Sequence, residues 1–298
     1  MDYVLKTEKL TKEYSHTKVV DSISVTVKQG DIYGFVGKNG AGKTTFIRIV
    51  LGLANQTEGT FEFFGGENLL QARKHIGSLI ESPALYTNMT ARENLNMFCT
   101  MLGTDKKEID TILETVGLVD TGKKKARDFS LGMKQRLGIG MALVGDPDFL
   151  ILDEPINGLD PTGIVEIREL LLKLKNQGKT IFISSHYLGE LEKIATRYGI
   201  IAKGRLVEEL TAEELSKKCG KRTVIKTNNA EAAKEIVSKF LGTDKVSIGT
   251  DGTLYVQDTI SDIGALTNEL FKAGIVVSGI SDDENSAEDY FIKRMEEQ

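Results

Sequence analysis

The residues best suited to chemistry form a glycine-rich stretch at 37–45, GKNGAGKTT, which fits the pattern G-x-x-x-x-G-K-[ST]. An apolar, strand-like run at 31–36 leads into it, and a helix-like run at 44–53 leads out. Because glycines lack a Cβ, the backbone can bring its N–H groups close to phosphate oxygens, and the following helix adds its partial positive N-terminus. We expect Lys43 to reach the β and γ phosphates of a nucleotide and Thr44 to offer a hydroxyl to Mg²⁺.

We call residues 37–45 the phosphate loop and expect every residue in it to contribute to a nucleotide site. A glycine-rich turn without a ligand is the alternative, but the length of the motif and the agreement of both flanks oppose it. The residues concerned are Gly37, Lys38, Asn39, Gly40, Ala41, Gly42, Lys43, Thr44 and Thr45.

A second group of polar residues follows two further apolar runs. Residues 149–153 read FLILD, which is typical of a buried parallel strand that delivers Asp153 to the carboxyl edge of a sheet. Asp153 is then placed to hold Mg²⁺, and Glu154 to orient or activate the attacking water. His186 follows the run TIFIS at 180–184, and we interpret Lys43, Glu154 and His186 as catalytic. The alternative is that the two carboxylates cap the next helix and that the histidine is a polar residue near the core.

Between these motifs lies FSLGMKQRL at 129–137, and NGLD follows the DEP. The order GKNGAGKTT, FSLGMKQRL, LILDEP, NGLD and SSH resembles the nucleotide-binding subunit of ABC transporters over the first 220 residues. The resemblance implies a homodimer or pseudo-dimer, clamped head to tail, with ATP between the phosphate loop of one subunit and Ser130 and Gly132 of the other. It also implies a role in trans for Asp160 and stacking of Tyr14 on adenine. A helix cap at Ser130 is expected as well, because a cap and an anion site use the same donors.

Glu81 departs from that family pattern. It lies in the segment 76–95, where the family has a glutamine that links the γ-phosphate site to the membrane partner. A carboxylate binds Mg²⁺ more strongly than an amide oxygen, so we expect Glu81 to be a nucleotide-site residue and a metal ligand. The alternative is that Glu81 ends a strand and faces solvent. With SLGMKQR at 130–136, the substitution resembles the bacitracin-exporter and lantibiotic-immunity branch, although other two-component exporters share much of the pattern.

The predicted fold class is α/β. We expect a P-loop NTPase domain of the ABC ATPase type at 1–220, with an antiparallel β subdomain and a helical subdomain at about 82–145. Residues 221–298 are expected to form a small accessory domain with a ferredoxin-like α+β fold, of element order βαββαβ. Asp251 and Gly252 are expected to form a hairpin turn within it. Strands of the β subdomain are expected at 4–10, 23–27 and 60–64, helices of the helical subdomain at 90–102, 106–116 and 131–144, and a last helix at 286–295.

Charge and hydropathy narrow the possible partners. The net charge of −5 falls entirely on residues 221–298, which contain 9 Lys and Arg against 14 Asp and Glu. An acidic accessory domain disfavours nucleic acid as a partner. No apolar run approaches the roughly 18 residues needed to cross a bilayer. We therefore expect a transmembrane permease on a separate chain, and we expect this chain to be cytoplasmic and peripheral on the inner face of the cell membrane.

The function expected from these observations is that of an ATP-binding, ATP-hydrolysing motor subunit with Mg²⁺, within an exporter of peptide antibiotics such as bacitracin or lantibiotics. A two-component exporter with other cargo is one alternative. A non-transport ABC protein acting on ribosomes or DNA is another, opposed by the lack of a second such domain or a long coiled coil. A regulator without turnover would have no use for the Glu154 carboxylate.

Overall fold

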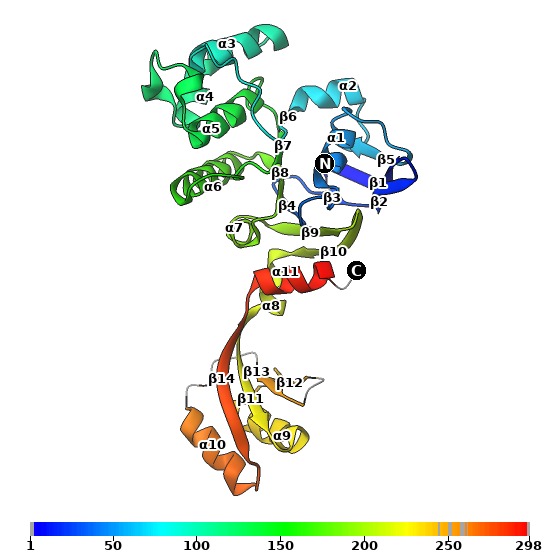
Figure 1. Ribbon diagram of the computed structural model, residues 1–298, viewed down its shortest axis with the longest axis vertical. Helices are drawn as coiled ribbons and strands as arrows, with labels where there is room; N and C mark the ends of the chain where they lie inside the picture. Colours follow the sequence, from blue (N-terminus) through cyan, green and yellow to red (C-terminus); the bar gives the residue numbers. More distant parts are fainter. Residues whose placement is uncertain (1–2, 244, 250–251, 257–259, 261, 297–298) are drawn as a thin grey trace. The chain divides into compact units, whose positions relative to one another are not determined.

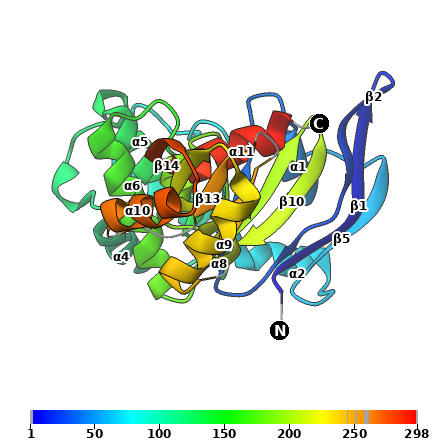
Figure 2. The same ribbon diagram turned by 90° about the horizontal axis from the view of Figure 1, so that it is seen from below.

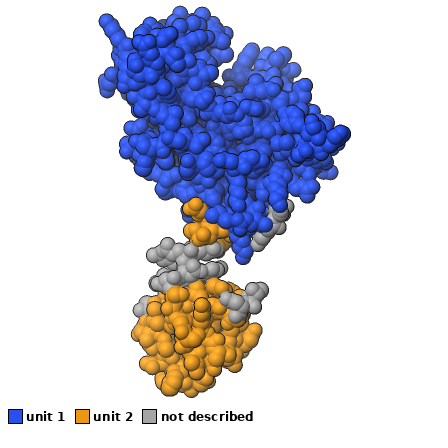
Figure 3. Space-filling view, viewed as in Figure 1, with its two compact units in different colours: residues 1–212, 291–298 blue, residues 213–290 orange. Residues whose placement is uncertain are grey.

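The computed structural model describes residues 3–243, 245–249, 252–256, 260 and 262–296. The chain packs as two compact units, one of residues 1–212 with 291–298 and one of residues 213–290 (Figure 3). We expected a boundary between residues 220 and 221; the packing divides the chain after residue 212 and returns its last residues to the first unit.

A six-stranded sheet forms the centre of the first unit (Figure 1). Its strand order is β10-β9-β4-β8-β7-β6, and every neighbouring pair is parallel except β10 with β9. The apolar runs that precede the phosphate loop and Glu154 are strands, as predicted, and every residue in these two strands is buried. The strands are β4 (Ile32–Val36), β6 (Ile76–Leu79), β7 (Phe149–Asp153), β8 (Thr180–Ser185), β9 (Arg197–Ala202) and β10 (Arg205–Thr211).

The two faces of this sheet are covered by different helices: α1 (Lys43–Val50) on one, and α6 (Pro161–Asn176) with α7 (Leu188–Glu192) on the other (Figure 1). On the α1 face, the ring of Phe46 lies 5.0 Å from that of Phe35 and 5.8 Å from that of Phe182. On the opposite face, a Cβ added to Gly34 would lie 3.4 Å from Leu191. Burial on both faces explains why these strands read as continuous apolar runs.

A second, antiparallel sheet packs over α1 and shares its hydrophobic core. The expected single strand at 23–27 is wrong, because β2 ends at Ile23 and β3 begins only at Thr26. Side chains interrupt the ladder there: the Val25 N–H donates to Thr7 Oγ1, and Ser24 Oγ accepts the Lys9 N–H. The strands are β1 (Leu5–Tyr14), β2 (Thr17–Ile23), β3 (Thr26–Val27) and β5 (Glu58–Phe63).

The predicted helical subdomain is present and lies at the opposite end of this unit from the antiparallel sheet (Figures 1 and 2). Its first long helix starts in a capping box, in which Thr90 and Glu93 satisfy each other's backbone N–H groups. No helix among the described residues is long and apolar enough to cross a membrane. The helices between β5 and β7 are α2 (Leu69–Ala72), α3 (Ala91–Leu102), α4 (Glu108–Thr115) and α5 (Leu131–Ala142), with short 3₁₀ turns at Arg73–His75, Val119–Thr121 and Ala126–Asp128.

The second unit has the element order that the sequence predicts, with strands and helices in the series βαββαβ. Its antiparallel sheet has the strand order β12-β13-β11-β14, and its core lies between this sheet and two helices. Asp251 of the expected turn lies outside the described residues. The elements from residue 212 onward are α8 (Ala212–Lys218), β11 (Gly220–Thr227), α9 (Ala230–Leu241), β12 (Val246–Ile248), β13 (Leu254–Val256), α10 (Ile263–Lys272), β14 (Val277–Asn285) and α11 (Ala287–Glu296). The second part of α11, from residue 291, belongs to the first unit.

Candidate nucleotide-binding site

The phosphate loop connects the carboxyl end of β4 to the N-terminus of α1, and close backbone packing fixes its path. Gly42 has φ +105°, and a Cβ there would lie 2.5 Å from the carbonyl oxygen of Val19. A Cβ on Gly37 would lie 2.6 Å from the carbonyl oxygen of Ile201. Gly40, in contrast, has φ +80° and open space where its Cβ would be. Backbone packing therefore fixes the loop at Gly37 and Gly42, while Gly40 faces open space, as a site for a phosphate chain requires.

An ion pair beside the loop ties β2 to β10. Arg205 Nε lies 2.7 Å from Asp21 Oδ2, and the guanidinium lowers the pKa of the Asp21 carboxyl below its usual value. The Gly204 N–H donates to the carbonyl of Ala41 in the loop, and the Gly204 carbonyl accepts the Asp21 N–H. Because the carboxyl stays ionised at neutral pH, this support persists under ordinary conditions.

Lys43 joins the phosphate loop to the strand beside it. Its side chain is 5% exposed, and Nζ donates to the carbonyl oxygens of Gly37 at 2.6 Å and Lys38 at 3.3 Å. The same Nζ lies 3.0 Å from Glu154 Oε1, as an ion pair without hydrogen-bond alignment. A buried ammonium needs such a counter-charge, so the loop lysine and the predicted catalytic glutamate compensate each other here.

Asp153 and Glu154 are neighbours in sequence but have different partners. Glu154 Oε2 lies 2.8 Å from the ring nitrogen Nδ1 of His186. The same oxygen accepts a hydrogen bond from the backbone N–H of His186 at 3.3 Å. Asp153 Oδ1 accepts a hydrogen bond from Ser184 Oγ, which in turn accepts the Glu154 N–H at 3.1 Å. The three residues predicted to be catalytic, Lys43, Glu154 and His186, therefore form one continuous series of contacts.

Glu154 holds a backbone conformation that is unfavourable for a residue with a Cβ, with φ +49°. Such left-handed conformations cost about 1–3 kcal/mol and persist only when the surroundings hold them. Here the Glu154 N–H is held by both the carbonyl and the hydroxyl oxygen of Ser184. The turn of the chain directs the Glu154 carboxylate toward Lys43 and His186 while Asp153 keeps its contact with Ser184.

The donor set fits a divalent cation bound with a nucleotide. The Asp153 side chain is fully buried, and its Oδ2 has no hydrogen-bond partner among the described residues. A buried carboxylate oxygen without a partner is costly, and a cation would remove that cost. Thr44 is in the first turn of α1, which packs against β7, the strand that carries Asp153. When bound, Mg²⁺ would supply positive charge to the transferring phosphoryl group.

Glu81 lies just after β6 and faces Arg48 of α1, whose Nη2 is 2.7 Å from Glu81 Oε1. Glu81 is 59% exposed in its side chain and has φ +55°. Arg48 follows Thr44 by four residues and so lies on the same face of α1, one turn further along. Glu81 is therefore held one helical turn away from the predicted Mg²⁺ ligand Thr44.

The remaining predicted residues lie outside this cluster. Tyr14 ends β1, is 49% exposed and has Lys12 Nζ 4.8 Å from its ring centroid. Ser130 caps α5 through the Met133 N–H, as expected, and Asp160 caps α6 through the Gly163 N–H. Both caps leave a helix N-terminus, with its N–H groups, at the surface of the unit.

Two residues of the site were not predicted from the sequence. Ser184 connects Asp153 to Glu154, and Arg48 holds Glu81. Ser184 could have been found, because the parallel register pairs it with Asp153 at the ends of β8 and β7. No local sequence signal relates Arg48 to Glu81, since 33 residues separate them.

Comparison with known proteins agrees with this geometry. The family model described as ABC transporter matches residues 20–157. The bacitracin transport ATP-binding protein BcrA of Enterococcus faecalis is 44% identical over 98% of this chain and 96% of its own length. BcrA of Bacillus licheniformis is 45% identical over 98% of this chain and 97% of its own length. The lantibiotic transport ATP-binding protein SrtF of Streptococcus pyogenes is 43% identical over 69% of this chain and 90% of its own length.

The chain therefore belongs to the family of ABC transporter ATP-binding proteins. Solved structures agree: a nucleotide-free ATP-binding cassette from an ABC transporter is similar with a TM-score of 0.65 and 25% identity. That likeness covers 72% of this chain and 94% of the other.

Replacing Glu154 by Gln removes the negative charge and keeps the shape of the side chain. We expect ATP binding to persist, ATP hydrolysis to fall by about 10²–10⁴-fold, and an ATP-bound dimer to accumulate, because a positioned general base contributes about that factor. Binding of a fluorescent ATP analogue, phosphate release and light scattering measure the three effects. Glu169→Gln, which changes an exposed carboxylate on α6, is the matched control. A Glu154→Gln protein that hydrolyses ATP at the wild-type rate would contradict the assignment.

Proposed function

We propose that this chain is the motor subunit of a membrane exporter of peptide antibiotics of the bacitracin or lantibiotic class, in which ATP binding closes a dimer and hydrolysis reopens it. The observation that carries the proposal is the extent of the match to the bacitracin transport proteins, which reaches 98% of this chain. The lantibiotic transport relative matches 69%. The likeness to the bacitracin transport proteins therefore extends through residues 213–290, and it favours bacitracin-like cargo.

In the proposed chemistry, the loop backbone and Lys43 bind the phosphates, and Thr44 with Asp153 would hold Mg²⁺. Binding of the phosphates gives Lys43 a new counter-charge, which releases the Glu154 carboxylate from the ion pair at 3.0 Å. Glu154 then orients the attacking water and accepts its proton, while His186, 2.8 Å away, positions that carboxylate. Asp153 Oδ2, which has no hydrogen-bond partner within the described part of the chain, supports this assignment of the Mg²⁺ ligands.

The proposed dimer is head to tail. ABC ATPases dimerise, and a dimeric post-hydrolysis cassette with ADP and phosphate is among the solved structures of this fold. Ser130, Gly132 and Asp160 would complete the site of the opposite subunit, and Tyr14 would stack on adenine. The helix N-terminus that Ser130 caps supports an anion contact in trans.

The second unit is proposed to have a ferredoxin-like fold. Its element order βαββαβ and its antiparallel sheet order β12-β13-β11-β14 support that classification. We further propose that a separate permease chain holds the protein at the inner face of the cell membrane, and that nucleic acid is not a partner.

The export proposal is tested in a sensitive bacterial host that produces this chain together with a candidate permease chain. We expect the minimal inhibitory concentration of bacitracin or of a lantibiotic to rise several-fold with the wild-type chain. We expect no rise with Glu154→Gln, because transport requires turnover. If neither peptide is tolerated better while the purified complex hydrolyses ATP, the proposed cargo class is wrong and the motor assignment stands.

We also propose that the Glu81 carboxylate moves when nucleotide binds. It leaves Arg48 and turns toward the Mg²⁺ that Thr44 and Asp153 would hold. The exposed ion pair between Glu81 and Arg48, at 2.7 Å, contributes little stability and is suited to exchange. Its position one turn from Thr44 supports a short movement.

Glu81→Gln should raise the Mg²⁺ concentration needed for half-maximal nucleotide binding by about tenfold, as loss of a supporting metal contact does. Arg48→Gln should lower it, because it releases Glu81. Both are measured with a fluorescent ATP analogue across a Mg²⁺ series, with the exposed Glu114→Gln on α4 as control. Equal Mg²⁺ dependence in all variants would show that Glu81 only ends a strand at the surface.

A further inference from the structure

The end of the last helix, α11, is packed on the unit that contains the phosphate loop. Phe291 is fully buried, with its ring centroid 5.5 Å from that of Tyr198 on β9. Arg294 Nε lies 2.7 Å from Oε2 of Glu208 on β10, and the Glu208 side chain is only 14% exposed. An aromatic contact and an ion pair with the mostly buried Glu208 therefore fix the end of α11 on the two strands at this edge of the sheet.

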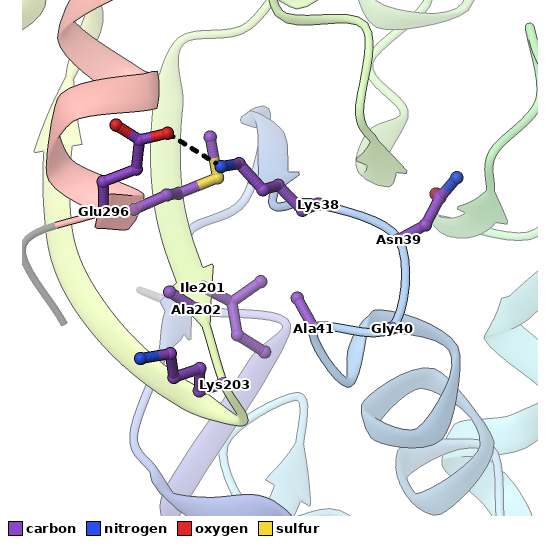
Figure 4. A pocket seen from close by; sticks show the side chains of 9 residues that line it. Lys38, Asn39, Gly40, Ala41, Ile201, Ala202, Lys203 and Glu296 are labelled. Atoms are coloured by element: carbon purple, nitrogen blue, oxygen red, sulfur yellow. Dashed lines mark hydrogen bonds and ion pairs between the residues drawn. The ribbon is translucent and has the colours of Figure 1, made fainter.

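Beyond these anchors, Met295 and Glu296 form one wall of a pocket of about 370 Å³ beside the phosphate loop (Figure 4). Loop residues 38–41 form the facing wall, and residues 201–203 line the rest. Glu296 Oε1 lies 3.1 Å from Lys38 Nζ, so the two side chains meet across the pocket. A glutamate from the end of the chain thus neutralises the second residue of the loop that binds phosphate.

Two electrostatic effects act on this contact. The C-terminal end of a helix carries partial negative charge, so a glutamate in the last turn of α11 is unfavourable unless a cation lies nearby. Lys293 and Arg294 lie in the same last turn, and Lys38 adds a cation from the phosphate loop. The pair is nonetheless 59% and 63% exposed in its side chains, so solvent screens it and it contributes little stability. It can therefore yield to a competitor that brings more negative charge to the loop.

We propose that the end of α11 lowers the affinity of the chain for nucleotide. Glu296 forms an ion pair with Lys38 in the nucleotide-free chain, and the phosphates of ATP must displace Glu296 before they can pair with Lys38. The inference rests on the nucleotide-binding part of the proposed function and not on its cargo. The restraint belongs to α11 of the same chain, and it acts on affinity for nucleotide rather than on the chemical step.

The helix that carries Glu296 crosses the boundary between the two units along the chain. The chain leaves the first unit after residue 212 and returns to it at residue 291, within α11. The helix that ends in Glu296 therefore begins in the second unit, at Ala287.

The test is equilibrium binding of a fluorescent non-hydrolysable ATP analogue to the full-length chain at low salt. Glu296→Gln should lower the Kd by about two- to fivefold, the range expected for an exposed ion pair, and the gain should disappear near 1 M salt. Glu288→Gln is the matched control, because it makes the same charge change in the first turn of the same helix. We expect it to leave the Kd at the wild-type value.

A Lys38→Gln variant distinguishes competition between Glu296 and ATP for Lys38 from long-range repulsion between Glu296 and the phosphates. In that background, Glu296→Gln should give no gain in affinity. A gain of equal size there, or equal gains from Glu296→Gln and Glu288→Gln, would overturn the proposal. Failure of the wild-type chain to bind the analogue at all would instead count against the proposed function, so the two failures are distinguishable. Equal urea midpoints for the variants would exclude a general loss of folding as the cause.

Discussion

The buried ammonium of Lys43 is the group on which the rest of the site depends. It cannot remain in the interior without a counter-charge, and in this state Glu154 supplies that charge at 3.0 Å. The contact is possible because β4, β8 and β7 are adjacent and parallel, so the phosphate loop, His186 and Glu154 follow strand ends at the same edge of one sheet. In the proposed function, phosphates replace the glutamate as the partner of Lys43, and this exchange would couple nucleotide binding to release of the Glu154 carboxylate.

The same pattern recurs around the loop. Cations on the loop and on α1 are each neutralised by a glutamate from a distant segment, and only the pair at the centre is buried. Nucleotide binding brings a large negative charge to this region and must redistribute the partners. The outer pairs are exposed and weak, which suits them to adjust the affinity and metal dependence that we propose, whereas the inner pair contains the glutamate that we propose as catalytic. The pairs are Lys38 with Glu296, Lys43 with Glu154, and Arg48 with Glu81.

The sequence was sufficient for the parts that local chemistry determines. The phosphate loop, the FLILD strand and the cap at Ser130 each depend on residue types at fixed spacing, and the structure has them as predicted. The contacts of Glu81 and Glu296 could not be predicted, because both partners depend on how distant segments pack. The interruption of the expected strand at 23–27 also has a tertiary cause, since side chains of β1 and residue 24 take the place of ladder hydrogen bonds.

The most direct test of the exchange at Lys43 is a crystal structure of the wild-type chain with Mg²⁺ and a non-hydrolysable ATP analogue. The account predicts that Lys43 Nζ leaves Glu154 Oε1 and the Gly37 carbonyl and contacts phosphate oxygens. Glu154 should then be free to hold a water while keeping its contact with His186. A complex in which the phosphates are bound and the Lys43 to Glu154 distance is still 3.0 Å would contradict the account.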